Sequence, residues 1–434
     1  MSSVTAGIVG IALLLLLFLL RMPVAFAMAF VGTVGFAYLA GLEPALSLLA
    51  QDIFQMFSSY PLSVIPLFIL MGSFAFASGI SQRLYKTAYT WVGHLRGGLT
   101  MATVLACAGF GAICGSSTAT AATMGKIALP EMKKYDYDDT LATGTVAAAG
   151  TLGILIPPST ILIVYGILVE ESIGKLFIAG VLPGILLTLS FVATVAFLCL
   201  RNPAIGPPGV PTSWKEKIKV LTGLIEAGIL FLLAIGGLFL GWFSPTQAGA
   251  IGAGGAVLIG LGRRQLSWQK FVEAGKDGLR TGCMVIFIIT GAVIFGHFMA
   301  ISTIPFALAY WIGNLAIPPL AVMAVLILIY FIGGFFMDSM ALVVVTIPIF
   351  FPIVEKLGFD PIWFGVIVVL VAEMGVITPP VGVNVFVLKG IAPEVPLESI
   401  YKGIFPFLVA LIIVTIILVI FPHIATLLPS LVSY

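Results

Sequence analysis

Long apolar runs, separated by short polar or charged stretches, cover almost the whole chain. A run of about 20 apolar residues is long enough for a helix to cross the hydrocarbon core of a membrane. We expect spans at 5–20, 23–40, 61–80, 140–168, 176–200, 221–242, 246–262, 281–301, 361–388 and 403–422. Two further runs, 99–132 and 318–355, each hold two apolar arms around a small polar tip. These two runs predict helical hairpins.

The chain contains one pattern twice, with the second copy 222 positions after the first. The first copy covers 115–159, opening with Gly-Ser-Ser-Thr-Ala-Thr and closing with Gly-Ile-Leu-Ile-Pro-Pro-Ser. The register holds without a gap, so that Ser117 pairs with Ser339 and Pro157 with Pro379. A Gly/Pro-interrupted apolar segment at matching positions in both halves of a membrane protein indicates a transport site near the bilayer midplane.

Positive charge is distributed unevenly over the loops. We place the N-terminus outside and let each hairpin return to the side from which it enters. Of the 20 Lys and Arg residues, only Lys175 and Lys356 then lie outside, as the positive-inside rule requires. Treating either hairpin as a single crossing destroys this bias. Each half then has five crossings and one re-entrant hairpin, which predicts an inverted-topology repeat with both chain termini on the outer face.

Four stretches between the spans mix apolar residues with Trp, Tyr or charge, namely 41–60, 81–98, 265–280 and 306–314. We interpret them as amphipathic helices lying along the membrane surface; the alternative is a docking surface for another subunit. The Pro- and Gly-rich segment 202–214 joins the two halves on the inner face.

Composition supports a polytopic membrane protein. The chain is 60% hydrophobic and 9% charged, with a mean hydropathy of +1.20, whereas soluble domains carry about 25% charged residues. No basic segment precedes the first run and Arg21 follows it, which favours a retained span over a cleaved signal peptide. The four cysteines, lying in apolar segments without CxxC spacing, are expected to be small buried hydrophobes; they are Cys107, Cys114, Cys199 and Cys283.

Each Pro-Pro pair removes two backbone donors and disfavours helix just before it. The carbonyls of roughly 153–156 and 375–378 therefore lack helical partners and are free to bind a hard cation. Neutral oxygens with at most one carboxylate suit a monovalent ion such as Na⁺. We predict one Na⁺ site in each half, between the hairpin tip and the break. Site 1 comprises Ser116, Ser117, Thr118, Gly153, Ile156 and Pro157, and site 2 comprises Gly334, Met337, Asp338, Ser339, Gly375, Thr378 and Pro379.

Half-helix N-termini after each tip and each Pro-Pro pair carry partial positive charge and attract an anion. No buried Lys or Arg is placed to take that role. We predict that an organic anion binds between the tips, touched by Ser117, Ser159, Thr160 and Asn384. Two alternatives stay open: the tip residues cap the returning helices, or Pro-Pro is a kink without a ligand. No catalytic constellation appears, and no cofactor apart from Na⁺ as coupling ion is expected.

Three further polar residues lie in or beside apolar spans. Glu373 precedes the second break and holds the repeat position of Thr151, so two roles stay open, a private hydrogen bond and a proton site. Glu226 is expected to snorkel or cap a helix end. His297 is expected to be a satisfied interior histidine rather than a ligand.

Several motifs resemble the large membrane subunit of TRAP transporters, the DctM-like family. The resemblance covers essentially the whole chain. It is carried by Arg-Met-Pro-Val-Ala-Phe-Ala at 21–27, the first tip, Leu-Pro-Glu-Met at 129–132, Ile-Pro-Pro-Ser at 156–159, Phe-Met-Asp at 336–338 and Ile-Thr-Pro-Pro-Val-Gly-Val-Asn at 377–384.

That resemblance implies a Na⁺-driven importer of organic acids, such as C4-dicarboxylates or sialic acid, in the bacterial inner membrane with periplasmic termini. It implies two partners, a small four-helix membrane subunit and a periplasmic substrate-binding protein. Because the chain begins at the large-subunit motif, we expect the small subunit to be a separate polypeptide. A self-sufficient Na⁺/dicarboxylate symporter of similar fold is the alternative; an enzyme or a channel is disfavoured.

The resemblance further implies an all-α elevator-type fold, in which a mobile transport unit moves against a scaffold. The scaffold would comprise 1–98 and the linker and helices of 201–317. The transport unit would comprise 99–200 and 318–422, followed by a periplasmic tail at 423–434.

Overall fold

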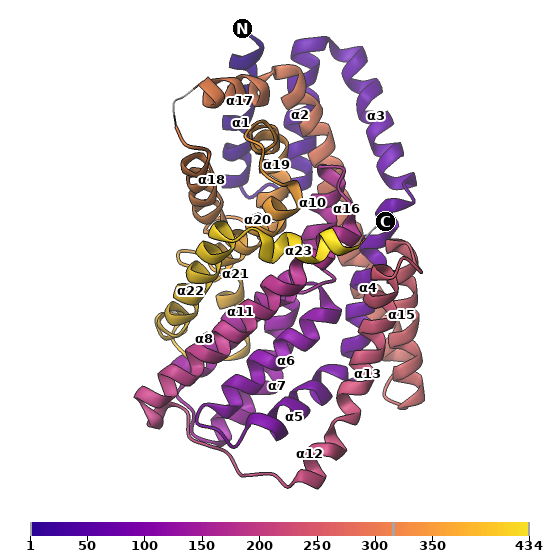
Figure 1. Cartoon of the computed structure of the whole chain (residues 1–434). Helices are drawn as coiled ribbons and strands as arrows, with labels where there is room; N and C mark the ends of the chain where they lie inside the picture. Colours follow the sequence, from indigo (N-terminus) through magenta and orange to yellow (C-terminus); the bar gives the residue numbers. More distant parts are fainter. Residues whose placement is uncertain (1, 315–316, 433–434) are drawn as a thin grey trace.

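The computed structural model describes residues 2–314 and 317–432, which form helices joined by short loops without a β-strand (Figure 1). The ends of two expected segments, 201–317 and 423–434, lie partly outside the described residues. The first half contains α1 (Ser3–Leu19), α2 (Val24–Ala40), α3 (Leu42–Ser58), η1 (Pro61–Ser63), α4 (Val64–Ala77), α5 (Ile80–Val92), α6 (Gly98–Cys114), α7 (Ser117–Lys134), α8 (Asp139–Gly150), α9 (Leu152–Leu155), α10 (Thr160–Leu168) and α11 (Ile173–Arg201).

The second half follows the short helix η2 (Pro203–Ile205) and repeats the order of a hairpin, a broken helix and a long helix. It contains α12 (Trp214–Val220), α13 (Thr222–Phe231), the π-helical turn η3 (Leu232–Gly236), α14 (Gly237–Phe239), α15 (Pro245–Gly262), α16 (Trp268–Ser302), α17 (Ile304–Asn314), α18 (Pro319–Gly334), α19 (Ser339–Lys356), α20 (Pro361–Val376), α21 (Val383–Ile391), α22 (Leu397–Ile420) and α23 (His423–Leu431).

Both predicted hairpins and both breaks are present as helix boundaries. In the first half α6 and α7 flank a two-residue tip, and the helix that ends at Leu155 resumes at Thr160 beyond the first Pro-Pro pair. In the second half α18 and α19 flank a four-residue tip, and α20 and α21 flank the second Pro-Pro pair. Proline cannot donate to the helical ladder, which explains why the chain leaves the helix at these positions.

Fewer helices are long enough to cross a membrane than the ten crossings expected from the sequence. Among the described residues, five helices are long and apolar enough to cross a membrane alone, and α19 is one of them. Two pairs bent at a break, α3 with η1–α4 and α8–α9 with α10, bring the number to seven. Five more apolar helices have 16 or 17 residues. The re-entrant course of the two hairpins stays a prediction.

Two expectations about the chain outside the hairpins are wrong. The expected surface helix 265–280 and the expected span 281–301 form one continuous helix, α16. Cys283 is exposed, whereas the other three cysteines are buried as expected. The expected periplasmic tail forms a helix over its described part, α23, which packs against α11; its side of the membrane stays a prediction.

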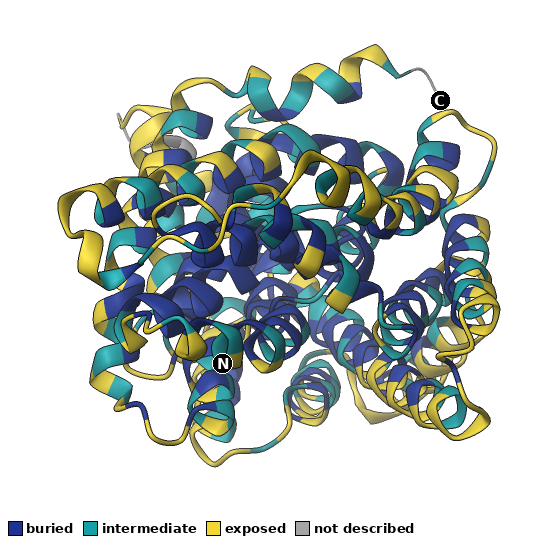
Figure 2. Cartoon of the chain, turned by 90° about the horizontal axis from the view of Figure 1, so that it is seen from below, coloured by how far each residue is buried: buried dark blue, intermediate teal, exposed yellow. Residues whose placement is uncertain are grey.

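The helices that precede the Pro-Pro pairs lie in the core. Every residue of 141–150 in α8 and of 363–376 in α20 is buried, while α3 is largely exposed. Figure 2 shows buried residues concentrated in the central helices and exposed residues around them. The first Pro-Pro pair is buried, as expected for unwound backbone that is shielded from lipid, whereas Pro379 and Pro380 of the second pair are exposed.

The two halves interleave at two separate places. In one, α22 packs on α8 at Gly403 and Gly144, where a Cβ on Gly144 would lie 2.5 Å from the Gly403 Cα. In the other, α4 packs between α15 and α16. Each contact joins helices from different halves, so neither half folds around a core of its own.

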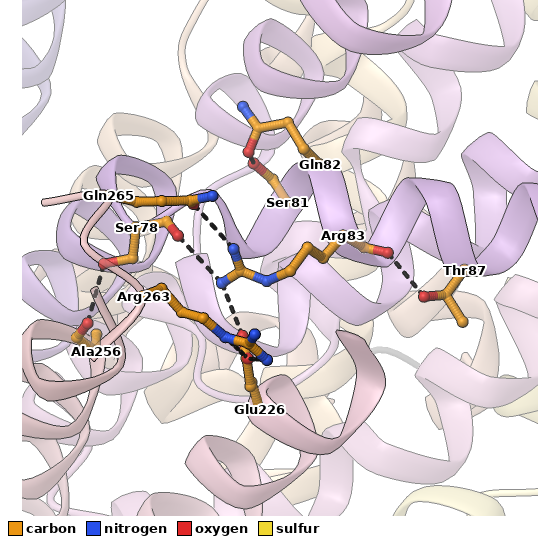
Figure 3. Close-up of polar contacts among 9 residues, drawn as sticks. All are labelled: Ser78, Ser81, Gln82, Arg83, Thr87, Glu226, Ala256, Arg263 and Gln265. Carbon is orange, nitrogen blue, oxygen red and sulfur yellow. Dashed lines mark hydrogen bonds and ion pairs between the residues drawn. The ribbon is translucent and has the colours of Figure 1, made fainter. Parts of the chain in front are cut away.

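An ion cluster joins α5 to α13 and to the end of α15 (Figure 3). Glu226 accepts from Arg263 Nε at 2.5 Å and lies 2.8 Å from Arg83 Nη2. Arg83 also donates to the Ser78 carbonyl at 3.1 Å and to Gln265 at 2.9 Å. Glu226 is therefore neither snorkelling nor capping a helix; it pairs with two arginines from different halves.

Replacing Glu226 with glutamine should destabilise the protein by about 2 kcal/mol, because Arg83 would keep its half-buried charge without a carboxylate. Thermal unfolding of the purified protein in detergent measures this effect. Glu398→Gln is the matched control, since its pair with Lys402 is exposed and such pairs contribute about 0–1 kcal/mol. Equal melting temperatures for the two variants would contradict the assigned role of the cluster.

A second polar pair crosses from α3 to α16. Asp52 is buried, and its Oδ2 lies 2.9 Å from Nδ1 of His297. His297 does have a partner, but it is not interior as expected, because its side chain is 42% exposed.

Candidate functional site

The tip of the first hairpin is a two-residue turn between α6 and α7. Gly115 has φ +66°, and a Cβ there would lie 2.6 Å from the Pro158 carbonyl oxygen, so the position requires glycine. Ser116 then caps α7 by accepting from the Ala119 N–H at 3.4 Å. The capping alternative is therefore correct for the Ser116 hydroxyl. Its carbonyl oxygen accepts from the Thr120 N–H at 3.1 Å and has a second lone pair for a ligand.

The first break lies directly against this tip. The Gly115 carbonyl accepts from the Thr160 hydroxyl at 2.9 Å and from the Thr160 N–H at 3.4 Å. Ser159 caps α10 by accepting from the Leu162 N–H at 3.2 Å. The tip and the break, which are 45 residues apart, thus form one structural unit, as the repeat pattern predicts.

Oxygen atoms converge on Gly153 at the end of the broken helix. A Cβ on Gly153 would lie 2.7 Å from the Ser116 carbonyl oxygen and against the Thr120 hydroxyl. Thr120 is buried, and its Oγ1 has no hydrogen-bond partner among the described residues. An unpartnered buried oxygen beside a carbonyl and a missing side chain makes a cradle for a small oxygen-binding ion. Ser116 and Gly153 were predicted here; Thr120 was not.

The other residues predicted for site 1 lie around this cradle. The Thr118 hydroxyl lies 3.3 Å from that of Ser116. Ile156 donates its N–H to the Leu152 carbonyl at 3.1 Å, which ends α9, and Pro157 follows in the break. Ser117 begins α7 and is directed toward the second half of the molecule, as described below.

The second tip and break reproduce this arrangement with different contacts. Asp338 holds the repeat position of Ser116 and caps α19 by accepting from the Met340 N–H at 3.1 Å. Gly334 packs against Gly375, since a Cβ on Gly334 would lie 2.9 Å from the Gly375 Cα. Gly111 and Gly153 make the equivalent close contact in the first half. These glycines let each hairpin touch its own broken helix.

Two other residues predicted for site 2 are engaged within their own segments. The Thr378 hydroxyl donates to the Met374 carbonyl at 2.5 Å, and the Met337 N–H donates to the Gly333 carbonyl at 3.1 Å. Pro379 follows Thr378 at the break. No cradle like that at Gly153 is found among the described residues of this half, and Asp338 supplies the charge instead.

Glu373 links the two tips. It is 1% exposed, and its Oε1 accepts from the Ser339 hydroxyl at 2.8 Å. Ser117 from the first tip lies beside the same carboxyl group, and Asp338 is its charged neighbour. The private hydrogen bond considered from the sequence is present, and sequence alone did not indicate that both halves contribute to it.

A cavity of about 400 Å³ lies between the first hairpin, the second tip and the helices α4 and α16. Its polar lining includes several predicted residues, and it also includes residues that sequence reasoning missed. The predicted residues are Ser116, Ser117, Thr118, Thr160 and Asp338, and the others are Ser73, Thr123, Lys126 and Thr281.

Lys126 is the lysine that lines this cavity. It lies on α7, is exposed, and makes no ion pair within the described residues. The prediction that no buried Lys or Arg serves the site does not cover Lys126, because this residue is exposed.

Two predicted substrate contacts lie outside this cavity. Ser159 is buried and caps α10. Asn384 is buried at the start of α21 and donates to the Ala147 carbonyl at 3.2 Å, which joins α21 to α8. Substrate contact by these two residues stays a prediction that the cavity does not support.

Residues 11–424 match the family model described as tripartite ATP-independent periplasmic transporter, DctM component. The chain is 37% identical over 384 residues to a C4-dicarboxylate TRAP transporter large permease protein of Pseudomonas aeruginosa, covering 88% of this chain and 89% of that protein. It is 31% identical over 411 residues to a sialic acid TRAP transporter large permease protein of Vibrio cholerae, covering 94% and 95%. An ectoine/5-hydroxyectoine TRAP transporter large permease protein of Ruegeria pomeroyi is 32% identical over 426 residues, covering 98% and 97%.

Two solved transporter structures share the fold. The YdaH transporter of Alcanivorax borkumensis superposes with a TM-score of 0.63 at 16% identity, covering 90% of this chain and 88% of that chain. MtrF of Neisseria gonorrhoeae superposes with a TM-score of 0.57 at 15% identity, covering 96% and 94%. At these identities the likeness concerns the fold alone.

Proposed function

The chain belongs to the DctM family of tripartite ATP-independent periplasmic transporters as a large permease subunit, and we propose that it couples Na⁺ entry to the import of an organic acid anion. The family places it among multi-pass membrane transporters, not enzymes. The observation that supports the proposal best is the cavity in which the first tip, Asp338 and Lys126 face one space.

The cavity suits a small organic anion in size and chemistry. Its volume of about 400 Å³ lies at the lower end of small-molecule pockets, which are about 300–1,000 Å³. Hydroxyl groups of the first tip can donate to a carboxylate, and Lys126 can neutralise its charge. C4-dicarboxylates and sialic acid, named for two of the relatives, both carry carboxylates. Uptake of a C4-dicarboxylate is therefore the first assay.

Two Na⁺ sites would accompany the anion. At site 1 the Ser116 carbonyl and the unpartnered Thr120 hydroxyl, beside Gly153, supply oxygens to a small cation. At site 2 Asp338, which lines the cavity, would supply a carboxylate, and the Gly334–Gly375 contact holds the hairpin against its own broken helix. Few carboxylates and several neutral oxygens favour a monovalent ion over Ca²⁺ or Mg²⁺. Bound Na⁺ would offset the charge of the anion and make its inward movement favourable.

An elevator movement would carry these sites across the membrane. The close α8–α22 contact ties the two hairpin-containing segments together, which supports a transport unit of 99–200 and 318–422. The α4–α15–α16 contact ties together the remaining segments as a scaffold. The cavity lies where one group of helices faces the other.

The proposed inverted topology predicts opposite labelling of two engineered cysteines. A cysteine near Lys133 should react with a membrane-impermeant thiol reagent from the cytoplasm, and one near Lys356 from the periplasm. Labelling in intact cells and in inverted vesicles measures this. The exposed Cys283 has to be replaced first, because it would react on its own. Labelling of both positions from one face would exclude opposite insertion of the halves.

Lys126→Gln should weaken transport of a dicarboxylate, because the cavity loses the cation that faces the substrate. We expect the KM for uptake to rise about tenfold, equivalent to about 1.4 kcal/mol, with a smaller effect for Lys126→Arg, which keeps the charge. Equal KM values for wild type and Lys126→Gln would remove Lys126 from the substrate site.

Reconstitution tests the function as a whole. Liposomes would contain this chain and a small four-helix subunit, with the periplasmic face of both directed outward. A periplasmic binding protein, added outside, would deliver labelled substrate. The proposal expects uptake only when an inward Na⁺ gradient and the binding protein are both present. Na⁺-driven uptake without the binding protein would favour the alternative, a self-sufficient Na⁺/dicarboxylate symporter. Uptake indifferent to Na⁺ would contradict both.

A further inference from the structure

Glu373 has an unused oxygen deep in the molecule. Its side chain is 1% exposed, and Oε1 accepts the Ser339 hydroxyl, whereas Oε2 has no hydrogen-bond partner among the described residues. A buried carboxylate is costly unless both oxygens are satisfied. The structure therefore provides one strong acceptor aimed into a dry interior.

The neighbours of this carboxyl come from both halves of the chain. Ser339 is the first residue of α19 and Ser117 the first of α7, and both hydroxyls lie beside it. Asp338 adds a second carboxylate. Within the described residues no Lys, Arg or His pairs with Glu373 or Asp338. One carboxylate and two hydroxyls thus meet, with Asp338 as an electrostatic neighbour and without a counter-charge.

We propose that Na⁺ binds at Glu373 Oε2, between the two hairpin tips, as a third cation site that both halves share. The proposal rests on the proposed Na⁺-coupled function. Its anchor, Glu373, belongs to neither site 1 nor site 2, although Ser117 and Ser339 are members of those sites. Carboxylate and hydroxyl oxygens are the ligands that a hard cation prefers, and one carboxylate with two hydroxyls suits a monovalent ion.

The repeat explains why this site occurs once. The position equivalent to Glu373 in the first half is Thr151, whose hydroxyl donates to the Ala148 carbonyl at 2.6 Å within its own helix. The first half therefore offers no carboxylate at the matching place. A site built on Glu373 can only be shared, with Ser117 as the contribution of the first half.

Cation binding at this place has a mechanical consequence. The ion bridges the ends of α7 and α19 and neutralises part of the charge of Glu373 and Asp338. The ion-loaded transport unit then holds both tips together, whereas the ion-free unit leaves the carboxylate of Glu373 in the field of Asp338 without a cation. Like charges repel, so the third ion couples the positions of the two hairpins.

Glu373→Gln tests the proposal in the reconstituted transporter. Glutamine has the size of glutamate and still accepts from Ser339, but it removes the charge. We expect the Na⁺ concentration for half-maximal uptake to rise at least about tenfold and the Hill coefficient for Na⁺ to fall by about one. Choline replaces Na⁺ to hold ionic strength constant. Glu355→Gln, on the exposed end of α19, is the matched control and should behave as wild type.

If Glu373→Gln does not fold, a second variant tests the same site. Glu373→Asp keeps the charge but withdraws it by one methylene, so half-maximal uptake should require several times more Na⁺ with an unchanged Hill coefficient. Unchanged Na⁺ dependence in the folded variants would overturn the third site. A change confined to the pH dependence of uptake would also overturn it and assign Glu373 to a proton. Wild-type uptake that ignores Na⁺ would refute the proposed function together with this site.

Discussion

Replacing Asp338 with alanine should reduce Na⁺-driven uptake at least about a hundredfold, the upper range for losing support of a metal site. Asp338 lines the cavity, caps α19 and supplies the carboxylate of the proposed second Na⁺ site. Alanine removes both the cap and the charge. Uptake of labelled substrate over a series of Na⁺ concentrations measures the effect, normalised to the amount of protein in the membrane.

Asp338→Asn separates the charge from the cap. An asparagine oxygen can still accept from the Met340 N–H, as Asn is also a favourable N-cap residue. We therefore expect Asp338→Asn to fold as wild type and to transport as poorly as Asp338→Ala. Wild-type rates and Na⁺ dependence in Asp338→Asn would show that this residue only caps the helix.

Gly153→Ala should have the second largest effect, because a single methyl group would fill the cradle of site 1. The new Cβ would lie 2.7 Å from the Ser116 carbonyl oxygen and against the Thr120 hydroxyl. Overpacking of this kind costs about 1–3 kcal/mol. If this cost falls on the Na⁺-bound state, the affinity for Na⁺ should fall about five- to 150-fold. Na⁺-dependent uptake measures it.

Gly254→Ala is the control for Gly153→Ala. Gly254 lies in α15, and nothing lies within 4 Å of where its Cβ would be. Both substitutions add one methyl group within a helix, so any general effect of alanine is the same. If Gly153→Ala retained the Na⁺ affinity of Gly254→Ala, the cradle would not be a cation site.

The breaks and tips could be predicted from sequence because single residue types determine them. Pro-Pro cannot continue a helix, and its recurrence at the same repeat positions identified both interruptions. The repeat also relates residues that act alike in the structure, since Asp138 caps α8 and Asp360 caps α20. Local chemistry sufficed for these features.

Contacts between distant segments could not be predicted. Thr120 lies one helical turn beyond the first tip, and only the folded chain shows that its hydroxyl meets Gly153 without a partner. Glu373 is an isolated carboxylate in the sequence, yet it meets Ser117 from the other half. The sequence shows Lys126 only as one of the positive charges of the inner face. Its direction toward the cavity depends on the packing of α7.

The long helix α16 shows a different limit. The charged residues of 265–280 indicated a surface segment separate from the following span. Lys, Arg and Glu are nevertheless good helix formers, and no Pro interrupts this stretch. The helix therefore runs on without a break to Ser302. The charged residues predicted where the chain leaves the lipid, but they did not predict where the helix begins or ends.

Equilibrium binding of ²²Na⁺ to the purified protein tests the central claim most directly, since it requires neither a substrate nor a partner. The account predicts saturable binding that unlabelled Na⁺ displaces and choline does not, weakened in both Gly153→Ala and Asp338→Asn and unchanged in Gly254→Ala. Absence of saturable binding in the wild type, or equal binding in all four proteins, would contradict it.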